Sequence, residues 1–477
     1  MAAPPQTPES QSKNPWLAAL ASAFVPGLGQ FYGGDRRRAI KLFVIDGVLV
    51  VMAMISVIFF QLEVIKLWAA LPSLGWVMVI NIVLLAYRAW AADDAYRLVS
   101  SQEGSVAVVF MAGLAATALI VLAPHALVGY YNLVQYSIID EVFAESEGTT
   151  ASPSETTLAN GDEVAGGEPV STSVPQVIET AAIWDGLERL NIVLLGGDAG
   201  AGRTNIRTDT TIVVSIDPET GDAVMFSVPR DFSGINLPDG MGVWDCDCFP
   251  NLVNDLYTVA MDNPEAFPGP GEPGVNAVKG ALGELFGLEI HYYALVTLDG
   301  FIGIIDALGG VTIDAPFTIV DEIYPHEDGV TEEYVEIPAG INHLDGHLAL
   351  AYARIRRHAN DFARMNRQRC LLEAVIEQSS PIELVANYPA IGEVLKESLL
   401  TDIPQDRLVD FIDLLPKVST DRIASLRITR EVYQIGSDVG RVYYDQDRIR
   451  EDAQSMLADP ASASSELGLE SLEDTCA

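Results

Sequence analysis

The sequence predicts an α/β protein: N-terminal transmembrane helices are followed by an extracellular domain with a mixed, partly antiparallel sheet flanked by helices. Three observations support this. The long apolar segments lie within the first 130 or so residues. An acidic stretch without Lys or Arg comes next. After it, β-branched runs alternate with segments of helical periodicity.

Composition narrows the class of protein. Of the 477 residues, 49% are hydrophobic, and 66 Asp and Glu stand against 28 Lys and Arg, a net charge of −38. The apolar fraction indicates membrane segments. The negative charge would repel a phosphate backbone, so no nucleic-acid partner is expected.

Three apolar segments are each long enough to cross a bilayer of about 30 Å: Leu42–Leu62, Leu67–Tyr87 and Val106–Tyr130. A fourth, Trp16–Tyr32, has only 17 residues and is interrupted at Pro26. A re-entrant or interfacial segment fits it as well as a span does. The membrane module is therefore expected over residues 15–135.

Basic residues predict the orientation. They cluster at 36–41 and 88–97, and none occurs between Arg97 and Arg189. The positive-inside rule then places both clusters in the cytoplasm and the chain beyond the third span outside the plasma membrane. Lys66, in a loop expected outside, is the exception.

Composition also divides the rest of the chain. Residues 1–14 are polar and predict a disordered cytoplasmic tail. Residues 136–188 are rich in Ser, Thr, Gly and acid and predict a flexible linker. The range 189–456 is expected to fold as the extracellular domain, and 457–477 is expected to be a disordered acidic tail.

Within this domain the patterns predict the order of elements. Two strands, Thr210–Ile216 and Asp222–Val228, flank the turn sequence D-P-E-T-G and indicate a hairpin. Residues Ala315–Ile337 indicate an insertion with an acidic loop. Further strands are expected at Leu190–Leu195 and His291–Thr297, and helices at Asn251–Met261, Val275–Phe286, Leu298–Leu308, Gly346–Ala353 and Phe362–Glu377.

Scarce positive charge is concentrated between Tyr352 and Gln368. Planar, permanently charged guanidinium groups bind phosphate in a fork, which suggests a pocket for a phosphate-rich substrate. The alternative is a solvated basic helix. Asp361 stands where an N-cap belongs. The segment holds Arg354, Arg356, Arg357, Arg364 and Arg367, with Arg369 directly after it.

Spacing within the segment divides these arginines. Arg354 and Arg356 alternate as on an extended chain, and Arg364, Arg367 and Gln368 share one face of a helix. These five are expected to point into the pocket, whereas Arg357 and Arg369 fit the solvated face.

Two acids bracket the turn after the first strand. Asp198 follows that strand and Asp209 begins the next, with Arg207 between them. Facing one rim of the sheet, they would suit Mg²⁺ (or Mn²⁺), which accepts one or two carboxylates beside phosphates. The alternative is a pair of ordinary turn acids. Arg230 and Asp231 end the neighbouring strand and either reach the same rim or pair with each other.

The remaining motifs do not indicate a catalytic function. Residues 197–204 nearly spell a P-loop, but Arg203 replaces the lysine and a strand follows, which argues against an ATPase. His343 and His347 lack the glutamate of a zinc hydrolase motif. A disulfide from Cys246 or Cys248 to Cys370 is expected in an oxidising compartment.

Six motifs occur in one order: L-N-I-V-L-L-G-G-D, R-T-D-T-T-I-V-V-S-I-D-P, S-V-P-R-D, L-D-G-F-I-G-I-I-D-A-L-G-G-V, I-P-A-G-I-N-H-L-D-G-H-L-A-L-A-Y-A-R-I-R and D-F-A-R-M-N-R-Q. In this order the chain resembles the LytR-CpsA-Psr (LCP) family over Leu190–Glu377. The short membrane motif P-G-L-G-Q-F-Y is similar to that of TM2-type membrane modules.

The LCP resemblance implies a membrane-anchored phosphotransferase. Its members move a glycopolymer from a polyprenyl-pyrophosphate carrier to peptidoglycan, so both substrates and membrane lipid are the expected partners. By motif, Asp198 and Asp209 match the Mg²⁺-binding acids. The residues around the pyrophosphate, expected to bind it and to act in catalysis, are matched by Arg207, Arg230, Arg354, Arg356, Arg364, Arg367 and Gln368.

Two features depart from the family pattern. Leu252 stands where members often have a Lys, and this chain has more than one membrane segment. The candidates for a general base are Asp231 and Asp361. Two alternative functions are a phosphohydrolase that only cleaves the lipid pyrophosphate and a non-catalytic, membrane-anchored regulator of the cell wall.

Overall fold

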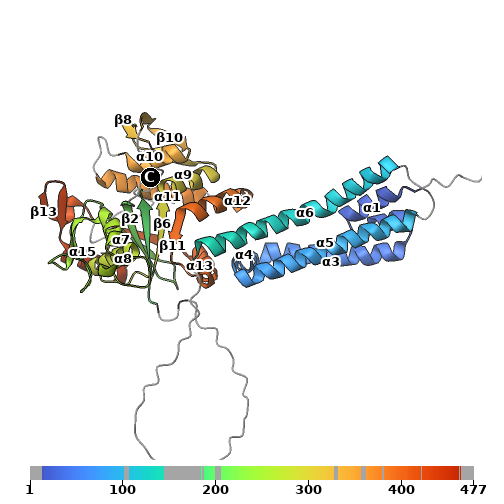
Figure 1. Cartoon of the computed structure of the whole chain (residues 1–477), viewed down its shortest axis with the longest axis horizontal. Coiled ribbons are helices and arrows are strands. Elements are labelled where there is room, and N and C mark those ends of the chain that lie inside the picture. Colours follow the sequence, from blue (N-terminus) through green and yellow to red (C-terminus); the bar gives the residue numbers. More distant parts are fainter. Residues whose placement is uncertain are drawn as a thin grey trace, which may run out of the picture.

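The computed structural model describes residues 13–100, 107–143, 184, 187–198, 206–326, 331–355, 361–378, 381–419, 422–460 and 462–463. A bundle of long helices lies on one side and a mixed α/β domain on the other (Figure 1). The predicted α/β class, with apolar N-terminal helices followed by a mixed sheet flanked by helices, is confirmed. The ranges 1–12 and 144–183 lie outside the described residues, and with them most of the predicted N-terminal tail and linker.

Within the described residues, six helices form the N-terminal part. Of the described stretches, three are long and apolar enough to cross a membrane by length and composition: Arg36–Ser56, Leu71–Ser100 and Phe110–Val142. They correspond to the three predicted spans. The helices are α1 Pro15–Phe24, α2 Leu28–Gly33, α3 Arg36–Phe59, α4 Gln61–Ala69, α5 Leu71–Ser100 and α6 Ala107–Val142.

Helix α1 is too short to be a span and is buried against its neighbours. Trp16 is 7% exposed, and its ring lies 4.6 Å from that of Tyr96 in α5 and 5.2 Å from that of Phe110 in α6. The helix ends at Phe24, before Pro26, whose missing N–H cannot continue it. The first apolar segment is therefore two short helices packed inside the bundle.

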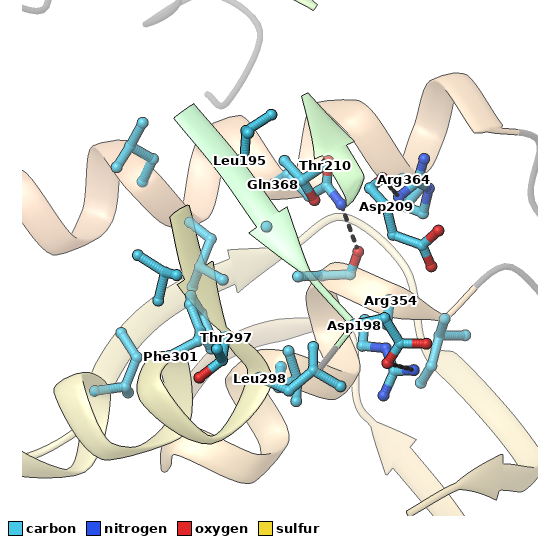
Figure 2. Close-up of a pocket in the computed structure, with 18 of the residues that line it drawn as sticks. Leu195, Asp198, Asp209, Thr210, Thr297, Leu298, Phe301, Arg354, Arg364 and Gln368 are labelled. Atoms are coloured by element: carbon cyan, nitrogen blue, oxygen red, sulfur yellow. Dashed lines mark hydrogen bonds and ion pairs between the residues drawn. The ribbon is translucent and has the colours of Figure 1, made fainter. Parts of the chain in front are cut away.

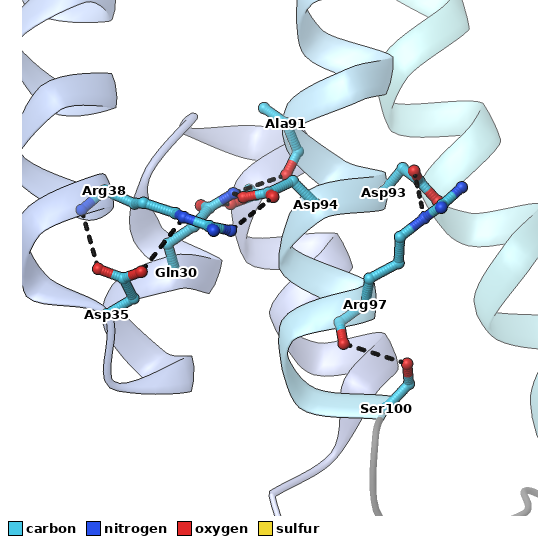
Figure 3. Close-up of polar contacts among 9 residues, drawn as sticks. Gln30, Asp35, Arg38, Ala91, Asp93, Asp94, Arg97 and Ser100 are labelled. Atoms are coloured by element: carbon cyan, nitrogen blue, oxygen red, sulfur yellow. Dashed lines mark hydrogen bonds and ion pairs between the residues drawn. The ribbon is translucent and has the colours of Figure 1, made fainter.

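A polar cluster joins α2, α3 and α5 at one end of this bundle (Figure 3). The fully buried amide of Gln30 donates to the Ala91 carbonyl at 2.9 Å and to the Asp94 carboxylate at 3.1 Å. Arg38 in α3 pairs with the same carboxylate at 2.9 Å. The basic N-terminus of α3 and the C-terminal part of α5 therefore lie at the same end.

A six-stranded sheet forms the centre of the second part, in the order β11-β6-β1-β2-β3-β12. β1 pairs antiparallel with β2 and parallel with β6, so the sheet is mixed. The predicted β2–β3 hairpin is present, and the Asp217 side chain accepts from the Glu219 and Thr220 amides in its turn. The strands are β1 Leu190–Gly197, β2 Thr208–Ile216, β3 Ala223–Val228, β6 Tyr292–Thr297, β11 Leu399–Thr401 and β12 Ile423–Arg427.

Helices cover both faces of this sheet. On one face, α7, α8 and α15 build the main core with β1, β2 and β3. On the other, α11 and α13 pack on the sheet, with α9 and α10 beside them. The bounds are α7 Leu256–Asp262, α8 Pro273–Phe286, α9 Leu298–Ala307, α10 Gly346–Arg354, α11 Asp361–Gln378, α12 Pro381–Ser398, α13 Leu408–Leu414 and α15 Gln446–Ala458.

Two predicted elements differ from the structure. The helix expected at Asn251–Met261 starts later, because β5 pairs with β4 as far as Leu252 and a 3₁₀ turn follows. The insertion at Ala315–Ile337 consists largely of strands, with β8 paired to β9. The bounds are β4 Ser233–Asn236, β5 Cys248–Leu252, η1 Val253–Asp255, β7 Val311–Ala315, β8 Ile319–Pro325, β9 Glu332–Ile337 and β10 Gly340–Leu344.

The remaining short elements lie around this core. They include a hairpin, β13–β14, that pairs antiparallel near the C-terminal end of the domain. The bounds are η2 Pro264–Ala266, η3 Gln405–Arg407, η4 Leu415–Lys417, α14 Arg430–Tyr433, β13 Gln434–Asp438 and β14 Arg441–Tyr444.

The α/β domain is docked on the helical bundle (Figure 1). Helix α6 continues past residue 135 to Val142 and packs against α12. A Cβ on Gly392 would come within 2.4 Å of Ile138, so the two helices approach closely. Lys66 in α4 pairs with Asp413 in α13 at 2.5 Å.

The predicted disulfide to Cys370 is wrong for Cys246 and Cys248. These two residues bridge each other across one intervening residue. Their Cα atoms are 5.1 Å apart, which is within the range that a disulfide spans. Cys370 is disulfide-bonded as well.

Candidate active site

A cavity of about 660 Å³ lies between the sheet and the helices α9, α10 and α11. Its wall has two kinds of surface (Figure 2). One part carries charged groups from the ends of β1 and α10, the start of β2 and α11. The other is apolar and includes Leu298, Phe301, Ile304, Leu372 and Val375.

The turn between β1 and β2 brings two carboxylates to the charged part. The pairing register shifts between Gly196 and Gly197, and the backbone amides of Asp198 and Asp209 both donate to the Arg207 carbonyl, at 2.7 and 3.0 Å. A Cβ on Gly196 would come within 2.9 Å of the Thr210 Cβ, so glycine permits this close pairing. Both acids line the cavity, as the sequence predicted.

Asp209 is the centre of a network of donors. Its carboxylate accepts from Arg230 at 2.6 Å and from Asn254 at 2.9 Å. Its backbone carbonyl accepts from Arg364 at 2.9 Å. Arg364 is only 3% exposed, and it lines the cavity together with Arg230. The arginines expected from two separate motifs therefore meet at one acid.

Asp198 has its own arginine. Arg354, the last residue of α10, approaches its carboxylate at 3.6 Å. The Arg354 guanidinium also lies 5.8 Å from the centre of the Tyr324 ring, a cation–π contact. Tyr324 is 1% exposed and comes from β8, in the insertion. Figure 2 shows Asp198 and Arg354 side by side.

Arg367 is turned toward the backbone instead of the cavity. Its guanidinium donates to the Tyr352 carbonyl at 2.6 Å and to the Ile355 carbonyl. Burial lowers the pKa of Arg367. These bonds fix the end of α10, where Arg354 is located. Gln368 does line the cavity and donates to the Ala353 carbonyl at 3.3 Å.

Two other predicted residues, Arg207 and Asp231, lie outside the cavity lining. Arg207 is largely exposed and pairs with Asp255 at 2.8 Å, away from the cavity lining. Asp231 is paired with Arg430 and accepts from the Tyr444 hydroxyl at 3.3 Å. Asp361 is the first described residue of α11, directly after residues that the structure does not describe, so its predicted role as N-cap stays a prediction. Arg356 and Arg357 are outside the described residues.

The prediction that Arg369 lies on a solvated face is wrong, because its side chain is fully buried. Among the described residues, none accepts a hydrogen bond from its guanidinium nitrogens. Burial lowers the pKa of Arg369 to about 10, with Arg427 adding to the effect and Glu373 opposing it. The helix α11 brings its buried face onto the sheet, and Arg369 lies on that face.

The sequence did not identify two residues that contact the charged groups of the site. Asn254 is not among the residues that the sequence predicted for the site, and its contact with Asp209 depends on the fold. Tyr324 lies in a segment interpreted as an insertion. One feature of the sequence could have indicated the apolar wall. Apart from two aspartates, the helix α9 consists of apolar residues and glycine, whereas a surface helix usually has a polar face.

The two acids fit a divalent cation. Mg²⁺ prefers one or two carboxylates and keeps waters that phosphate oxygens can replace. Asp198 and Asp209 offer carboxylate oxygens from adjacent backbone positions in the same cavity. The arginines paired with them show that the acids face positive charge here.

Comparison with known proteins identifies the family of this chain. Residues 148–457 match the LytR_cpsA_psr family, which is more than half of the chain. The polyisoprenyl-teichoic acid–peptidoglycan teichoic acid transferase TagU of Halalkalibacterium halodurans is 30% identical over 256 residues, which cover 53% of this chain and 72% of that relative. TagV of Bacillus subtilis, also a polyisoprenyl-teichoic acid–peptidoglycan teichoic acid transferase by name, is 27% identical over 50% of this chain and 56% of its own length.

Among solved structures, the crystal structure of TagV from B. subtilis is similar with a TM-score of 0.42 and 25% identity. It covers 57% of this chain and 98% of that one. The family match over residues 148–457 includes the α/β domain and all six motifs. The chain belongs to the LytR_cpsA_psr family.

Proposed function

We propose that this protein transfers a glycopolymer from a polyprenyl-pyrophosphate carrier to peptidoglycan. The observation that carries the proposal is the two-part cavity. The apolar part of the cavity wall is continuous with the charged part, which holds Arg230, Arg354 and Arg364. A polyprenyl pyrophosphate has the same division into an apolar chain and an anionic head. The relatives named as transferases use a polyisoprenyl-linked polymer as donor.

In this reaction a hydroxyl of peptidoglycan attacks the phosphorus nearer the sugar. A new P–O bond forms to the acceptor oxygen, the bond to the bridging oxygen breaks, and polyprenyl phosphate leaves. The hydroxyl proton passes to a base or to water. The arginines stabilise negative charge on the phosphate oxygens and on the leaving phosphate. Asp198 and Asp209 would hold Mg²⁺, which would neutralise further charge there.

The membrane topology is part of the proposal. Arg38 and Arg97 lie near one end of the bundle, and the α/β domain docks at the other (Figure 1). This supports a multi-pass protein with its basic end in the cytoplasm and its catalytic domain outside. Lys66, the exception to the charge rule, pairs with Asp413 of that domain at 2.5 Å. Its charge is neutralised where it lies.

The test uses the full chain in lipid vesicles with a lipid-linked glycopolymer. Polymer should become bound to peptidoglycan, and polyprenyl phosphate should accumulate only when the acceptor is present. Arg354→Ala should lower the rate about 10²–10³-fold. Arg422→Ala, which removes an exposed arginine near a distant turn, should leave it unchanged. Equal lipid cleavage without acceptor would favour a phosphohydrolase, and binding without turnover would favour a regulator.

A further inference from the structure

A second group of metal-binding side chains lies outside the acid pair. His326 follows β8, Glu333 is in β9, and His347 is in the first turn of α10. Their potential ligand atoms all lie within 4.8 Å of one another. All three residues are partly buried. The sequence did not suggest this group, because the three come from separate elements.

Contacts already hold these side chains together. His347 Nε2 lies 2.5 Å from a carboxylate oxygen of Glu333. The His326 ring stacks on the His347 ring with centroids 5.4 Å apart and planes at 29°. The His326 amide donates to the Thr331 carbonyl at 3.0 Å, which fixes its backbone at the loop end of the β8–β9 hairpin.

We propose that His326, Glu333 and His347 bind a divalent first-row transition-metal ion, with Zn²⁺ as its representative. Two imidazoles and one carboxylate suit Zn²⁺ and similar ions, whereas Mg²⁺ prefers oxygen ligands alone. Zn²⁺ with ligands at about 2.0–2.2 Å places them roughly 3.4 Å apart in a tetrahedron. The ion would replace the direct contact between His347 and Glu333, and the most distant ligand pair would close by about an ångström.

The position of this group indicates what the ion does. It would join the β8–β9 hairpin to α10, and β8 supplies Asp321, Ile323 and Tyr324 to the cavity wall. The Tyr324 ring lies edge-on to the His347 ring at 5.8 Å. The Arg354 guanidinium lies over the face of the same Tyr324 ring. The ion therefore fastens one wall of the cavity and the ring that supports Arg354. This role is structural and does not depend on which reaction the cavity performs.

Zn²⁺ titration of the full, untagged chain in detergent tests this site. The protein is first treated with a chelator, and excess Mg²⁺ is then added to occupy the acid pair. Calorimetry should show one Zn²⁺ per chain, and Zn²⁺ should raise the thermal midpoint. His326→Ala and His347→Ala should each weaken binding at least about 100-fold. Glu333→Gln, which keeps the side-chain shape, should weaken it at least about 10-fold.

His343→Ala is the matched control. This residue is on β10, four positions before His347, and its ring bonds the Gly309 carbonyl at 3.0 Å instead of the other histidines. The control should bind Zn²⁺ as the wild type does. Binding that survives in the double variant His326→Ala/His347→Ala, or that is lost equally in His343→Ala, would overturn the proposal. Circular dichroism of each variant shows whether a loss reflects unfolding.

Discussion

At the scale of residues, the charged end of the cavity is a network in which each acid has an arginine partner. Asp209 accepts from Arg230, and Asp198 faces Arg354. Paired in this way, the guanidinium groups are held in place before any substrate arrives. The groups that would meet a pyrophosphate are therefore preorganised, the condition under which electrostatic stabilisation is most effective.

Asp209→Asn tests this network. The amide keeps the shape of the side chain but loses the charge that holds Arg230 and would hold a cation. We expect the transfer rate to fall about 10²–10³-fold, measured as initial rate at saturating donor. The control is Asp222→Asn, an exposed acid in the β2–β3 turn, whose rate should stay at the wild-type value. A full rate in both variants would contradict the assignment of Asp209.

Arg369 and Arg367 give opposite predictions for stability. Arg369 is buried with no hydrogen-bond acceptor among the described residues, whereas Arg367 donates to two carbonyls. Burial outweighs the opposing charge of Glu373 in lowering the pKa of Arg369, so we expect Arg369→Met to stabilise the protein by about 1–4 kcal/mol. Arg367→Met should lower stability, because two carbonyls lose their donor. Thermal unfolding of the full chain in detergent measures both, and a lower midpoint for Arg369→Met would refute the argument.

The stabilisation expected for Arg369→Met depends on pH, because the pKa of Arg369 is lowered in the folded chain. Below its folded pKa of about 10, Arg369 is charged in the folded and the unfolded chain, so the cost of burial is fully present. The cost falls as pH rises through about 10 toward the unfolded value, because only the folded chain then loses the proton. The gain from Arg369→Met should therefore be the same at pH 7 and pH 9, as measured by paired unfolding experiments.

The sequence predicted many site residues but not their contacts. Asp198, Asp209, Arg230, Arg354, Arg364 and Gln368 line one cavity as expected. Arg367 and Arg369 show the limit. Helical spacing gives the face of α11 on which a residue lies, but it does not say whether that face meets a cavity, a backbone carbonyl or the sheet. Those outcomes depend on where α11 packs.

At the scale of elements, α9 forms much of the apolar wall of the cavity. It contributes Leu298, Phe301 and Ile304. It lies close to α12, since a Cβ on Gly303 would come within 2.8 Å of Val394. A wall held this tightly cannot move back to make room for a larger side chain.

The variant Ile304→Trp tests the apolar part of the cavity, because the tightly packed wall cannot move back to admit a larger side chain. The larger ring should fill the apolar part and weaken binding of a long polyprenyl pyrophosphate at least about 10-fold through lost apolar burial. Binding of inorganic pyrophosphate should be unaffected, because the arginines are unchanged. Calorimetry with the two ligands separates these effects. Ile435→Trp, at an exposed position in β13, is the control. An equal loss for both ligands would mean that the cavity is not divided as described.

Element types were predicted best where local pattern decides them. The β2–β3 hairpin and the helices α8, α9, α10 and α11 lie where turn residues and periodicity placed them. The segment near Asn251 was wrong at its start because pairing with β4 overrides its helical spacing up to Leu252. The β8–β9 hairpin was missed as strands, since charged residues interrupt its alternation.

At the scale of the whole molecule, the docking of the α/β domain on α6 and α4 fixes its position relative to the bundle. The contacts join parts of the chain more than 240 residues apart, such as Gln405 and the Phe143 carbonyl at 3.2 Å. Trp68 and Tyr388 pack with ring centres 4.9 Å apart. No local pattern encodes such contacts, so the sequence predicted the order of the two parts and not their arrangement.

Gly392→Leu should disturb this arrangement. The new side chain would collide with Ile138 and push α12 away from α6. We expect slower transfer from a donor embedded in vesicles but an unchanged rate with a short-chain, water-soluble donor, because none of the residues that line the cavity is replaced. Gly75→Leu is the control, since no atom lies within 4 Å of the position of its Cβ. Equal slowing with both donors would show that docking is not the cause.

The most direct measurement is an experimental structure of the full chain with a bound polyprenyl pyrophosphate. The account predicts phosphate oxygens within hydrogen-bond distance of Arg230, Arg354 and Arg364, and a prenyl chain along Phe301, Ile304 and Leu372. A lipid bound elsewhere, or a head group at the apolar part of the cavity, would contradict it.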